Sequence, residues 1–457
     1  IAIHHAGVMT VLREMVELLF ERGFIRMLVA TETFAVGINM PTKTVIFTSV
    51  TKFDGHGPRP LFPHEYTQMA GRAGRRGIDT VGQVIHCSNL ISKAAMDEYP
   101  RMLCGGAQKL RSKFKISYGL VLNVIASGHS DSLAIESFVK NSMLGKEIQS
   151  ELLSLSTELD LVRKNYERLE KAQSVASRTP VEIILEYKQL SSSLSDRTVR
   201  MRQKQRKNAE KRVKQIEDEN PHLQSDMNTL INLENAKEES NHVHSRKDDC
   251  ESFFANAIGE VTAFLTQEGF LTSTEDGALE LTASGRAAGQ LQEVHPLVVG
   301  NLIVETDYMA TWTAEDIISL LSVFTQIKLP DDMKKHASDD EHATRVQSEI
   351  DRYADQEARS MIPCSADHDS VHFDLMDEMR RWSRATDEVE CASIINALKE
   401  KGVFLGDFVK AVLKINNVAS ELEKVAEAEG KIAFLEKLRT IPTLTMKYVA
   451  TNQSLYI

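Results

Sequence analysis

The chain has 457 residues, a length that suggests three or four folded units. Its hydrophobic fraction of 42% and charged fraction of 26% are typical of soluble globular protein. No apolar run approaches the roughly 20 residues that a membrane helix needs, and no signal peptide precedes the first motif, so a membrane protein is not expected. The net charge of −11 argues against coating nucleic acid by bulk charge but is compatible with a local basic groove. Five scattered cysteines without a CxxC pair favour reduced thiols in an intracellular compartment over a disulfide framework or a zinc site.

Residues 1–90 alternate between helix-like and strand-like segments. Apolar spacing predicts a helix over residues 10–22, and short apolar runs predict strands over residues 25–30, 44–48 and 81–86. Strands joined by helices and glycine-rich turns indicate a parallel sheet, whose ligands gather at the carboxyl ends of the strands. The chain opens directly on a motif-like HHAG stretch, and a domain rarely begins this close to its chemistry, so we interpret the sequence as a fragment.

A heptad pattern begins near residue 149. Apolar residues at 3-4-3-4-3 spacing form a seam made of Leu152, Leu155, Leu159, Val162, Tyr166 and Leu169. After a break over residues 174–180, a second periodic stretch continues to about residue 218, and the short connection predicts an antiparallel pair of helices that projects as a stalk. The polar, acid-rich residues 222–248 are expected to form a weakly packed return.

Compact patterning resumes at residue 250. An amphipathic helix is predicted over residues 253–268, followed by a small hairpin over residues 270–281 that turns at an EDG sequence. A helix followed by a hairpin is typical of a winged-helix module. From residue 282 onward the pattern is helical, with a polar, acid-rich interruption over residues 331–343.

The strongest chemical signal is the sequence QMAGRAGRRG at residues 68–77. Arg72 and Arg75 each follow a glycine, which allows the backbone of this turn to approach a phosphate closely. Phosphoryl transfer spreads negative charge over the γ-phosphate, and an inserted guanidinium stabilises that charge. The alternative is a basic surface loop, but QxxGRxGRxG opening off a predicted helix is specific enough to make this alternative weak.

A second signal is the sequence TETFAVGINMP at residues 31–41, which follows a predicted strand. Gly37 would let the chain turn tightly, and Thr31 and Asn39 would present short polar groups to a phosphate or a sugar. Alone, this segment could be an ordinary β-turn-α loop. The arginine motif downstream makes that interpretation less favourable.

Together these motifs resemble the superfamily 2 RNA helicases of the superkiller-like, exosome-associated DExH-box type. HHAG at residues 4–7, TETFAVGINMP, the KFDG loop at residues 52–55 and QMAGRAGRRG occur in that family in the same order and spacing. There they are the late motifs of the second RecA-like motor lobe. The resemblance therefore implies that this sequence is the C-terminal part of such a helicase.

The resemblance implies a role for each matching position. The positions that it places at ATP are the catalytic arginine fingers Arg72 and Arg75 and the nucleotide-contacting Gln68, Gly37 and Asn39. The positions that it places on RNA are Thr31 and Thr33, together with Lys52 and Arg59 of a hairpin over residues 48–60 that separates the duplex.

The resemblance also implies a division into domains. It predicts an α/β RecA-like lobe that is incomplete at its start, then a winged helix interrupted by a coiled-coil stalk, and an all-α helical bundle. The expected bounds are residues 1–108 for the lobe, 109–146 and 249–285 for the two parts of the winged helix, 147–248 for the inserted, arch-like stalk, and 286–457 for the bundle. The stalk is too short for the globular tip that some relatives carry.

The sequence lacks a GxxxxGK[ST] phosphate loop and a DExH motif on a strand. The near-match at Asp340-Glu341-His342 lies in a polar stretch without a preceding apolar strand, so we interpret it as coincidence. ATP and Mg²⁺ are therefore expected to be held mainly by a first lobe outside this sequence, and no metal ligand is assigned within it. The chain alone is expected to be inert.

For the intact protein, the resemblance implies an ATP-dependent RNA helicase that moves 3′ to 5′ and feeds RNA to processing or decay. The expected partners are RNA and the exosome or other RNA-decay cofactors, with no membrane, and the protein would act as a monomer within a larger complex in the nucleus or the cytoplasm. Two alternatives stay open. One is a DNA-repair helicase with the same lobes, and the other is a non-catalytic scaffold of an RNA-decay complex.

Some residues allow both a structural and a functional interpretation. The basic run of the second stalk stretch is either a solvated face or a stripe that guides RNA or docks a partner; it comprises Arg197, Arg200, Arg202, Lys204, Arg206, Lys207, Lys211, Arg212 and Lys214. His4 and His5 are predicted to form a structural turn rather than a metal site, because no other ligand lies at metal spacing. Trp312 and Trp382 are predicted to lie in the core rather than to stack on bases.

Overall fold

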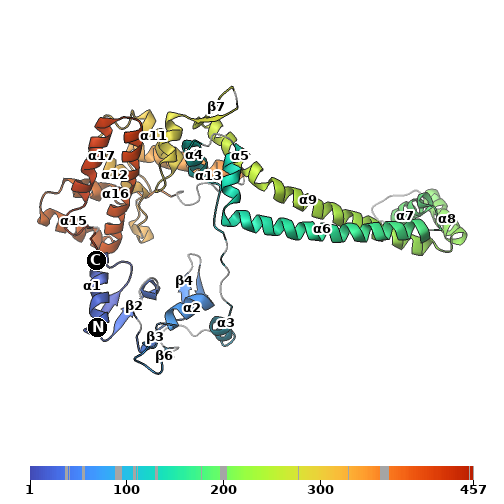
Figure 1. Ribbon diagram of the computed structural model, residues 1–457, viewed down its shortest axis with the longest axis horizontal. Helices are drawn as coiled ribbons and strands as arrows, with labels where there is room; N and C mark the ends of the chain where they lie inside the picture. Colours follow the sequence, from blue (N-terminus) through green and yellow to red (C-terminus); the bar gives the residue numbers. More distant parts are fainter. Residues whose placement is uncertain are drawn as a thin grey trace. The chain divides into compact units, whose positions relative to one another are not determined.

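Helices dominate the computed structural model of the chain, which has 17 α-helices and eight short strands in its described part (Figure 1). The structure describes the chain except for residues 36–39, 41, 54–56, 88–94, 107–109, 111, 129–131, 177, 196–202, 276, 328, 361–369, 452 and 456–457. Two compact units are formed, one by Ile1–Asp131 with Val261–Ile457 and the other by Ser132–Glu260. Within the described residues, no helix is both long enough and apolar enough to cross a membrane.

The N-terminal part of the larger unit contains two parallel strand pairs, as the sequence predicts, but they form two separate two-stranded sheets beside one antiparallel hairpin. Its elements are β1 (Ala2–His4), α1 (Thr10–Glu21), β2 (Leu28–Ala30), the 3-10 helix η1 (Glu32–Ala35), β3 (Thr44–Phe47), β4 (Thr51–Phe53), β5 (Pro58–Pro60), α2 (Pro63–Ala70), β6 (Gln83–His86) and α3 (Glu98–Cys104). β1 pairs with β2 across α1, and β3 pairs with β6 across the β4–β5 hairpin and α2. Parallel strands require crossovers of this kind, and the crossover from β3 to β6 carries the hairpin and α2.

A small apolar core holds α2 and α3 against β3. Phe47, Leu61 and Met102 are buried in this core, and Tyr66 of α2 stacks on Phe47 with ring centroids 5.2 Å apart. Burial of each such side chain stabilises the fold by roughly 1.5–3 kcal/mol. The core fixes the position of α2, and α2 leads directly into the arginine motif.

The smaller unit is built from two long helices with two shorter ones at one end (Figure 1). Its elements are α5 (Ser132–Lys140), α6 (Met143–Ala176), α7 (Val181–Ser195), α8 (Gln203–Glu219) and most of α9 (Leu223–Gln267). All six residues of the predicted heptad seam on α6 are buried or half-buried, which confirms that part of the prediction.

The predicted partner of that seam is wrong. The helix beside α6 is α9, because Arg246 of α9 lies 3.6 Å from the carboxylate of Glu151 and 3.8 Å from that of Glu158 (Figure 1). Near the other end of α6, Asp226 at the start of α9 accepts the backbone N–H of Thr179 at 2.9 Å. Since higher numbers on one helix meet lower numbers on the other, the two helices are antiparallel.

α7 and α8, which were predicted as the return arm, form a compact tip. They surround an apolar cluster with the first turns of α9, made of Ile184, Tyr187, Ile216, Leu223 and Leu230. Residues 222–248 form a well-ordered arm rather than a weakly packed return. Their periodicity is hard to recognise, because α9 buries residues as small as Ala236 among polar neighbours.

A helix–hairpin arrangement follows in the larger unit, and its hairpin is the predicted one. Its elements are α4 (Tyr118–Ala126), β7 (Leu271–Ser273), β8 (Leu279–Leu281) and α10 (Ala283–Gly289), and α4 packs against both β8 and α10. Gly277 adopts a φ of +78°, which only glycine takes without strain, and so lets the hairpin turn. The helix before the hairpin is the continuation of α9, so the expected new start near residue 250 is wrong.

The C-terminal part of the larger unit is helical, as predicted. Its elements are α11 (Pro296–Glu305), α12 (Ala314–Leu321), η2 (Ser322–Phe324), η3 (Asp331–Met333), α13 (Glu341–Ser360), α14 (Met376–Arg384), α15 (Glu388–Glu400), α16 (Leu405–Ala428) and α17 (Ile432–Thr445). Trp382 is fully buried and donates its indole N–H to the carbonyl of Thr445 at 2.9 Å, which confirms its core role. Trp312 is half-buried against His342, with ring centroids 4.5 Å apart.

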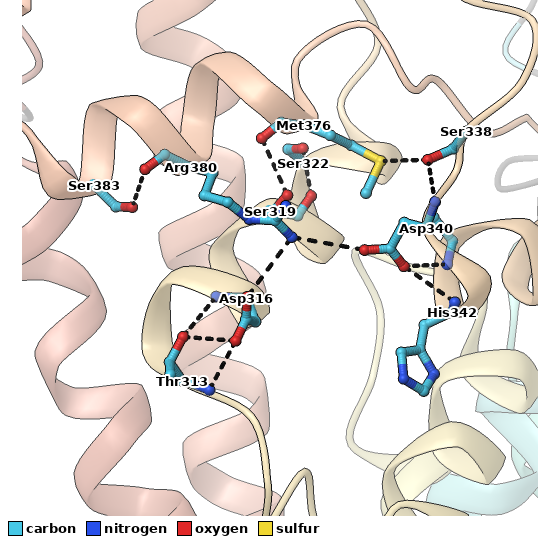
Figure 2. Close-up of polar contacts among 11 residues, drawn as sticks. Thr313, Asp316, Ser319, Ser322, Ser338, Asp340, His342, Met376, Arg380 and Ser383 are labelled. Carbon is cyan, nitrogen blue, oxygen red and sulfur yellow. Dashed lines mark hydrogen bonds and ion pairs between the residues drawn. The ribbon is translucent and has the colours of Figure 1, made fainter.

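Polar contacts join three helices of this bundle (Figure 2). The guanidinium of Arg380 on α14 lies between Asp316 of α12, at 3.7 Å, and Asp340 before α13, at 3.6 Å. Asp340 also accepts the backbone N–H groups of His342 and Ala343, both at 3.1 Å, and therefore caps α13. The near-match at residues 340–342 is thus the start of a helix and not a strand motif, as expected.

Candidate functional site

The arginine motif forms a tight turn at the end of α2. The backbone of Arg72 and Gly74 brackets Thr42: the Thr42 N–H donates to the Arg72 carbonyl at 2.8 Å, and the Gly74 N–H donates to the Thr42 carbonyl at 2.6 Å. Gly74 has a φ of +92°, and a Cβ at Gly82 would lie 2.4 Å from the carbonyl oxygen of Ala73. The glycines are therefore required by the turn itself, which is fixed to the residue that leads into β3.

Arg75 is held in place by Asp79. Its Nε and Nη2 donate to the two carboxylate oxygens at 2.8 and 3.0 Å, and its backbone N–H donates to Oδ2 at 3.0 Å. This bidentate bond lowers the pKa of Asp79 to about 2 and raises the pKa of Arg75. The Arg75 side chain remains 43% exposed, so its charge is oriented and still reachable from solvent.

The other positions predicted at the nucleotide lie on the same segment or outside the described residues. Gln68 is exposed on α2, and Arg72 is half-buried in the turn. The structure therefore brings Gln68, Arg72 and Arg75 onto one helix end. Gly37 and Asn39 lie outside the residues that the structure describes, so their predicted contacts stay predictions.

The stretch that begins at Thr31 is anchored to β1. Thr31 is exposed directly after β2, and its N–H donates to the carbonyl of His4 at 3.1 Å. His4 is buried, with Nε2 2.6 Å from a carboxylate oxygen of Glu17 on α1 and its ring edge against Phe34 of η1. These contacts give His4 a structural role, but as the last residue of β1 rather than in the predicted turn. Thr33 lies within η1.

The two basic residues of the β4–β5 hairpin meet one carboxylate. Lys52 of β4 and Arg59 of β5 are directly opposite each other, and both contact Glu65 of α2. Glu65 accepts two N–H groups of Arg59 at 2.8 and 2.9 Å and the Lys52 ammonium at 3.3 Å. Lys52 also lies 2.8 Å from Glu32 of η1. The structure thus joins the hairpin predicted to touch RNA with both motif-bearing segments.

These contacts shift the acid–base properties of the cluster. The hydrogen bonds from Arg59, helped by those from Phe62 and Lys52, lower the pKa of Glu65 to about 2. The hydrogen bond that Lys52 donates to Glu32, with a smaller contribution from the one it donates to Glu65, raises the pKa of Lys52. The charged forms of Glu65 and Lys52 are therefore both favoured, and contact with carboxylates partly neutralises the two cations inside the protein.

Sequence reasoning missed the three acidic partners Asp79, Glu65 and Glu17. Asp79 had a recognisable signal, because it lies four residues after Arg75 and residues at this spacing meet on a helical turn. Glu65 and Glu17 contact residues 13 positions or fewer away through strand–helix packing, and no local rule predicts such pairs. Among the described residues, no group of three or more His, Cys, Asp or Glu side chains could hold a metal ion.

Comparison with known proteins identifies two domains. Residues 1–77 match the model of the helicase conserved C-terminal domain, which is a RecA-like lobe, and residues 278–446 match the DSHCT (NUC185) domain. The first match contains the arginine turn and the hairpin. The second contains the helices from α11 to α17 and the polar contacts of Arg380 (Figure 2).

Similar proteins include named helicases from fungi and mammals. The antiviral helicase SKI2 of Saccharomyces cerevisiae is 37% identical over 207 residues, covering 44% of this chain and 16% of the relative. The superkiller complex protein 2 of Homo sapiens is 45% identical over 143 residues, covering 31% and 11%. The ATP-dependent RNA helicase mtr4 of Schizosaccharomyces pombe is 48% identical over 127 residues, covering 27% and 11%. The matched segments span less than a fifth of these relatives.

Proposed function

We propose that this chain, which belongs to the superkiller-like DExH-box helicases, is the C-terminal part of an ATP-dependent RNA helicase that moves 3′ to 5′ and supplies RNA for processing or decay. The observation that supports this most is the arginine turn at the end of α2. A guanidinium fixed by a bidentate carboxylate on a glycine turn is the kind of group that stabilises charge on a transferring phosphoryl group.

Within this proposal, each residue of the turn has one task. Bound ATP with Mg²⁺ would supply the phosphoryl group, and the metal would be held mainly by a first motor lobe. Asp79 occupies Nε and Nη2 of Arg75, so we place the phosphate contact at Nη1. Arg72 would meet the phosphates from the same turn, and Gln68, Gly37 and Asn39 would contact the nucleotide beside it. Because both lobes are needed, we expect the chain alone to have no ATPase activity.

The RNA side of the proposal concerns the stretch that begins at Thr31 and the β4–β5 hairpin. Thr31 and Thr33 would contact the RNA backbone, and the β4–β5 hairpin with Lys52 and Arg59 would separate the duplex. The helix–hairpin arrangement of α4, β7, β8 and α10 would be a winged helix, and α6 to α9 an arch-like stalk. Together with the DSHCT bundle, the winged helix would enclose one RNA strand. RNA-decay factors such as the exosome would be the partners of the complete protein.

The decisive experiment uses the purified full-length protein and duplexes that differ in one property at a time. RNA duplexes with a 3′ single-stranded extension should be unwound when ATP is present, while the same duplexes with a 5′ extension should remain intact. Preferential unwinding of DNA would favour the DNA-repair alternative. ATP-independent binding of RNA or decay factors without any unwinding would favour the scaffold.

A further inference from the structure

Four charged side chains from three separate segments form one connected cluster, in which Lys52 and Arg59 contact Glu65 and Lys52 also contacts Glu32. They are Glu32 of η1, Lys52 of β4, Arg59 of β5 and Glu65 of α2, joined by contacts of 2.8 to 3.3 Å. The segments are those that carry the Thr31 stretch, the hairpin and the helix that ends in the arginine turn. No single role predicted for any of these residues explains why all of them converge.

The hairpin needs Glu65 for a simple electrostatic reason. Lys52 and Arg59 are a directly opposed pair, and like charges at such positions repel each other. Glu65 lies between them and accepts hydrogen bonds from both, so its charge converts the repulsion into attraction. The carboxylate therefore fixes both strands of the hairpin with one group.

The bonding capacity of Glu65 is fully used. An ionised carboxylate offers about four acceptor positions. Oε1 accepts from Arg59 Nη2 and Lys52 Nζ, while Oε2 accepts from Arg59 Nη1 and from the backbone N–H of Phe62 at 2.8 Å. The side chain is only 13% exposed, so little water screens these bonds. A displacement of the hairpin therefore acts on Glu65 with little compensation from solvent.

From Glu65 the connection to the arginine turn is short and rigid. Glu65 lies in the first turn of α2, and the helix continues through Gln68 to Ala70. The turn that follows is bound to Thr42 through the backbone of Arg72 and Gly74. α2 is one short helix that packs against the apolar core as a unit. A displacement of its first turn therefore also displaces its last turn.

We propose that Glu65 is the residue that couples the hairpin to the arginine turn, so that the position of the hairpin on nucleic acid and the position of Arg75 change together. The inference rests on the proposed function, because it assigns the hairpin to RNA and the turn to the nucleotide. Lys52 and Arg59 then act chiefly as the hairpin's attachment points to α2. Glu32 extends the connection to the Thr31 stretch through Lys52.

The test is Glu65→Gln in the full-length protein, with Glu186→Gln as the matched control. Glu186 accepts the same kind of bidentate bond from Arg212, at 2.8 Å on both sides, but lies in the smaller unit. ATPase activity and duplex unwinding are measured in the same preparation. We expect unwinding per ATP hydrolysed to fall about ten-fold in Glu65→Gln and to stay within about two-fold of wild type in Glu186→Gln. An equal loss of both activities, or no change in either, would overturn the proposal.

A second measurement does not depend on helicase activity. Hydrogen exchange should increase in Glu65→Gln at the amides of the hairpin and also at those of residues 72–79, while Glu186→Gln leaves both unchanged. An increase confined to the hairpin would show that no coupling to the turn exists. If the wild-type protein unwinds no RNA, the proposed function fails, and the exchange data still decide whether the two segments are connected. A thermal unfolding curve confirms that both variants are folded.

Discussion

The lobe and the stalk each contain an arginine–glutamate pair with the same geometry and different surroundings. Arg59 with Glu65 in the lobe and Arg212 with Glu186 in the stalk both form two bonds of 2.8–2.9 Å. In the stalk pair the side chains are 41% and 40% exposed, whereas in the lobe they are 22% and 13% exposed. Glu65 also binds a second cation and a backbone N–H. The two ion pairs have the same hydrogen-bond lengths, so these lengths do not distinguish their roles. What distinguishes the pair in the lobe is that it joins separate segments and is less exposed to water.

The largest effect is expected where an arginine meets developing charge. In the full-length protein, Arg75→Ala should lower kcat for ATP hydrolysis by about 100-fold or more, corresponding to about 3 kcal/mol, because the role proposed for its guanidinium is to stabilise charge in the transition state. Arg101→Ala is the control in the same lobe, since Arg101 also pairs with an aspartate four positions away but is 81% exposed. A steady-state ATPase assay measures kcat for both variants. A kcat near that of wild type for Arg75→Ala would contradict the assignment of Arg75 as an arginine finger.

A smaller effect is expected from the residue that orients the finger. Asp79→Asn should lower kcat by about ten-fold with little change in KM for ATP. The Arg75 guanidinium remains but loses its bidentate hydrogen bond to a charged carboxylate. The hydrogen bonds from Arg75 lower the pKa of Asp79 to about 2, below its value in the unfolded chain. The interaction between Arg75 and Asp79 therefore stabilises the fold above about pH 4, and this stability is lost as the pH falls through about 2. The ATPase rates of wild type and Asp79→Asn should therefore keep a constant ratio above about pH 5. A ratio that changes there would show that Asp79 titrates.

Removal of the stalk tip should leave the motor unaffected. The ion pairs of Arg246 with Glu151 and Glu158 set the register of α6 and α9, so replacing residues 166–236 by about six Gly and Ser residues would join the helices at one level. We expect ATPase and unwinding of a simple duplex to stay within about two-fold of wild type. Loss of basal ATPase activity in a folded variant would show that the stalk, like the lobe, is needed for ATP hydrolysis.

A modest effect, on binding alone, is expected on α8, where the exposed part of the basic run lies. Arg206→Glu with Lys207→Glu should weaken binding of structured RNA or a partner by a few-fold, and more at low salt than at high salt, because screening shortens the range of exposed charges. Binding titrations at two salt concentrations measure this. Unchanged affinities would identify the run as a solvated face, which is the alternative left open by the sequence.

The parallel strand pairs of the lobe, the β7–β8 hairpin and the seam of α6 were predictable because each depends on a local sequence pattern. Short apolar runs give β2, β3 and β6, whereas β1 was not predicted, and heptad spacing gives the buried face that contains Leu155 and Val162. The partner of α6 was not predictable in this way. α9 buries Ala236 and Val243 between polar residues, while α7 and α8 show stronger periodicity but pack with each other.

The same limit applies to the candidate site. The glycines and arginines of the turn were recognisable, because a turn with positive φ and a cationic group leave a fixed local signature. Glu65 was not, since its role depends on a strand pairing that brings Lys52 and Arg59 to the same side of the hairpin. Residues such as Thr31, whose roles follow only from resemblance, remain predictions.

The central claim is that the arginine turn of this lobe meets the nucleotide during hydrolysis. It is tested most directly by hydrogen exchange of the full-length protein with RNA, Mg²⁺ and ADP–aluminium fluoride, which mimics the transferring phosphoryl group. We predict that the amides of residues 72–79 become protected relative to ADP alone, and that this protection is lost in Arg75→Ala. Unchanged exchange at these amides, in a complex that shows protection elsewhere in the protein, would contradict the account.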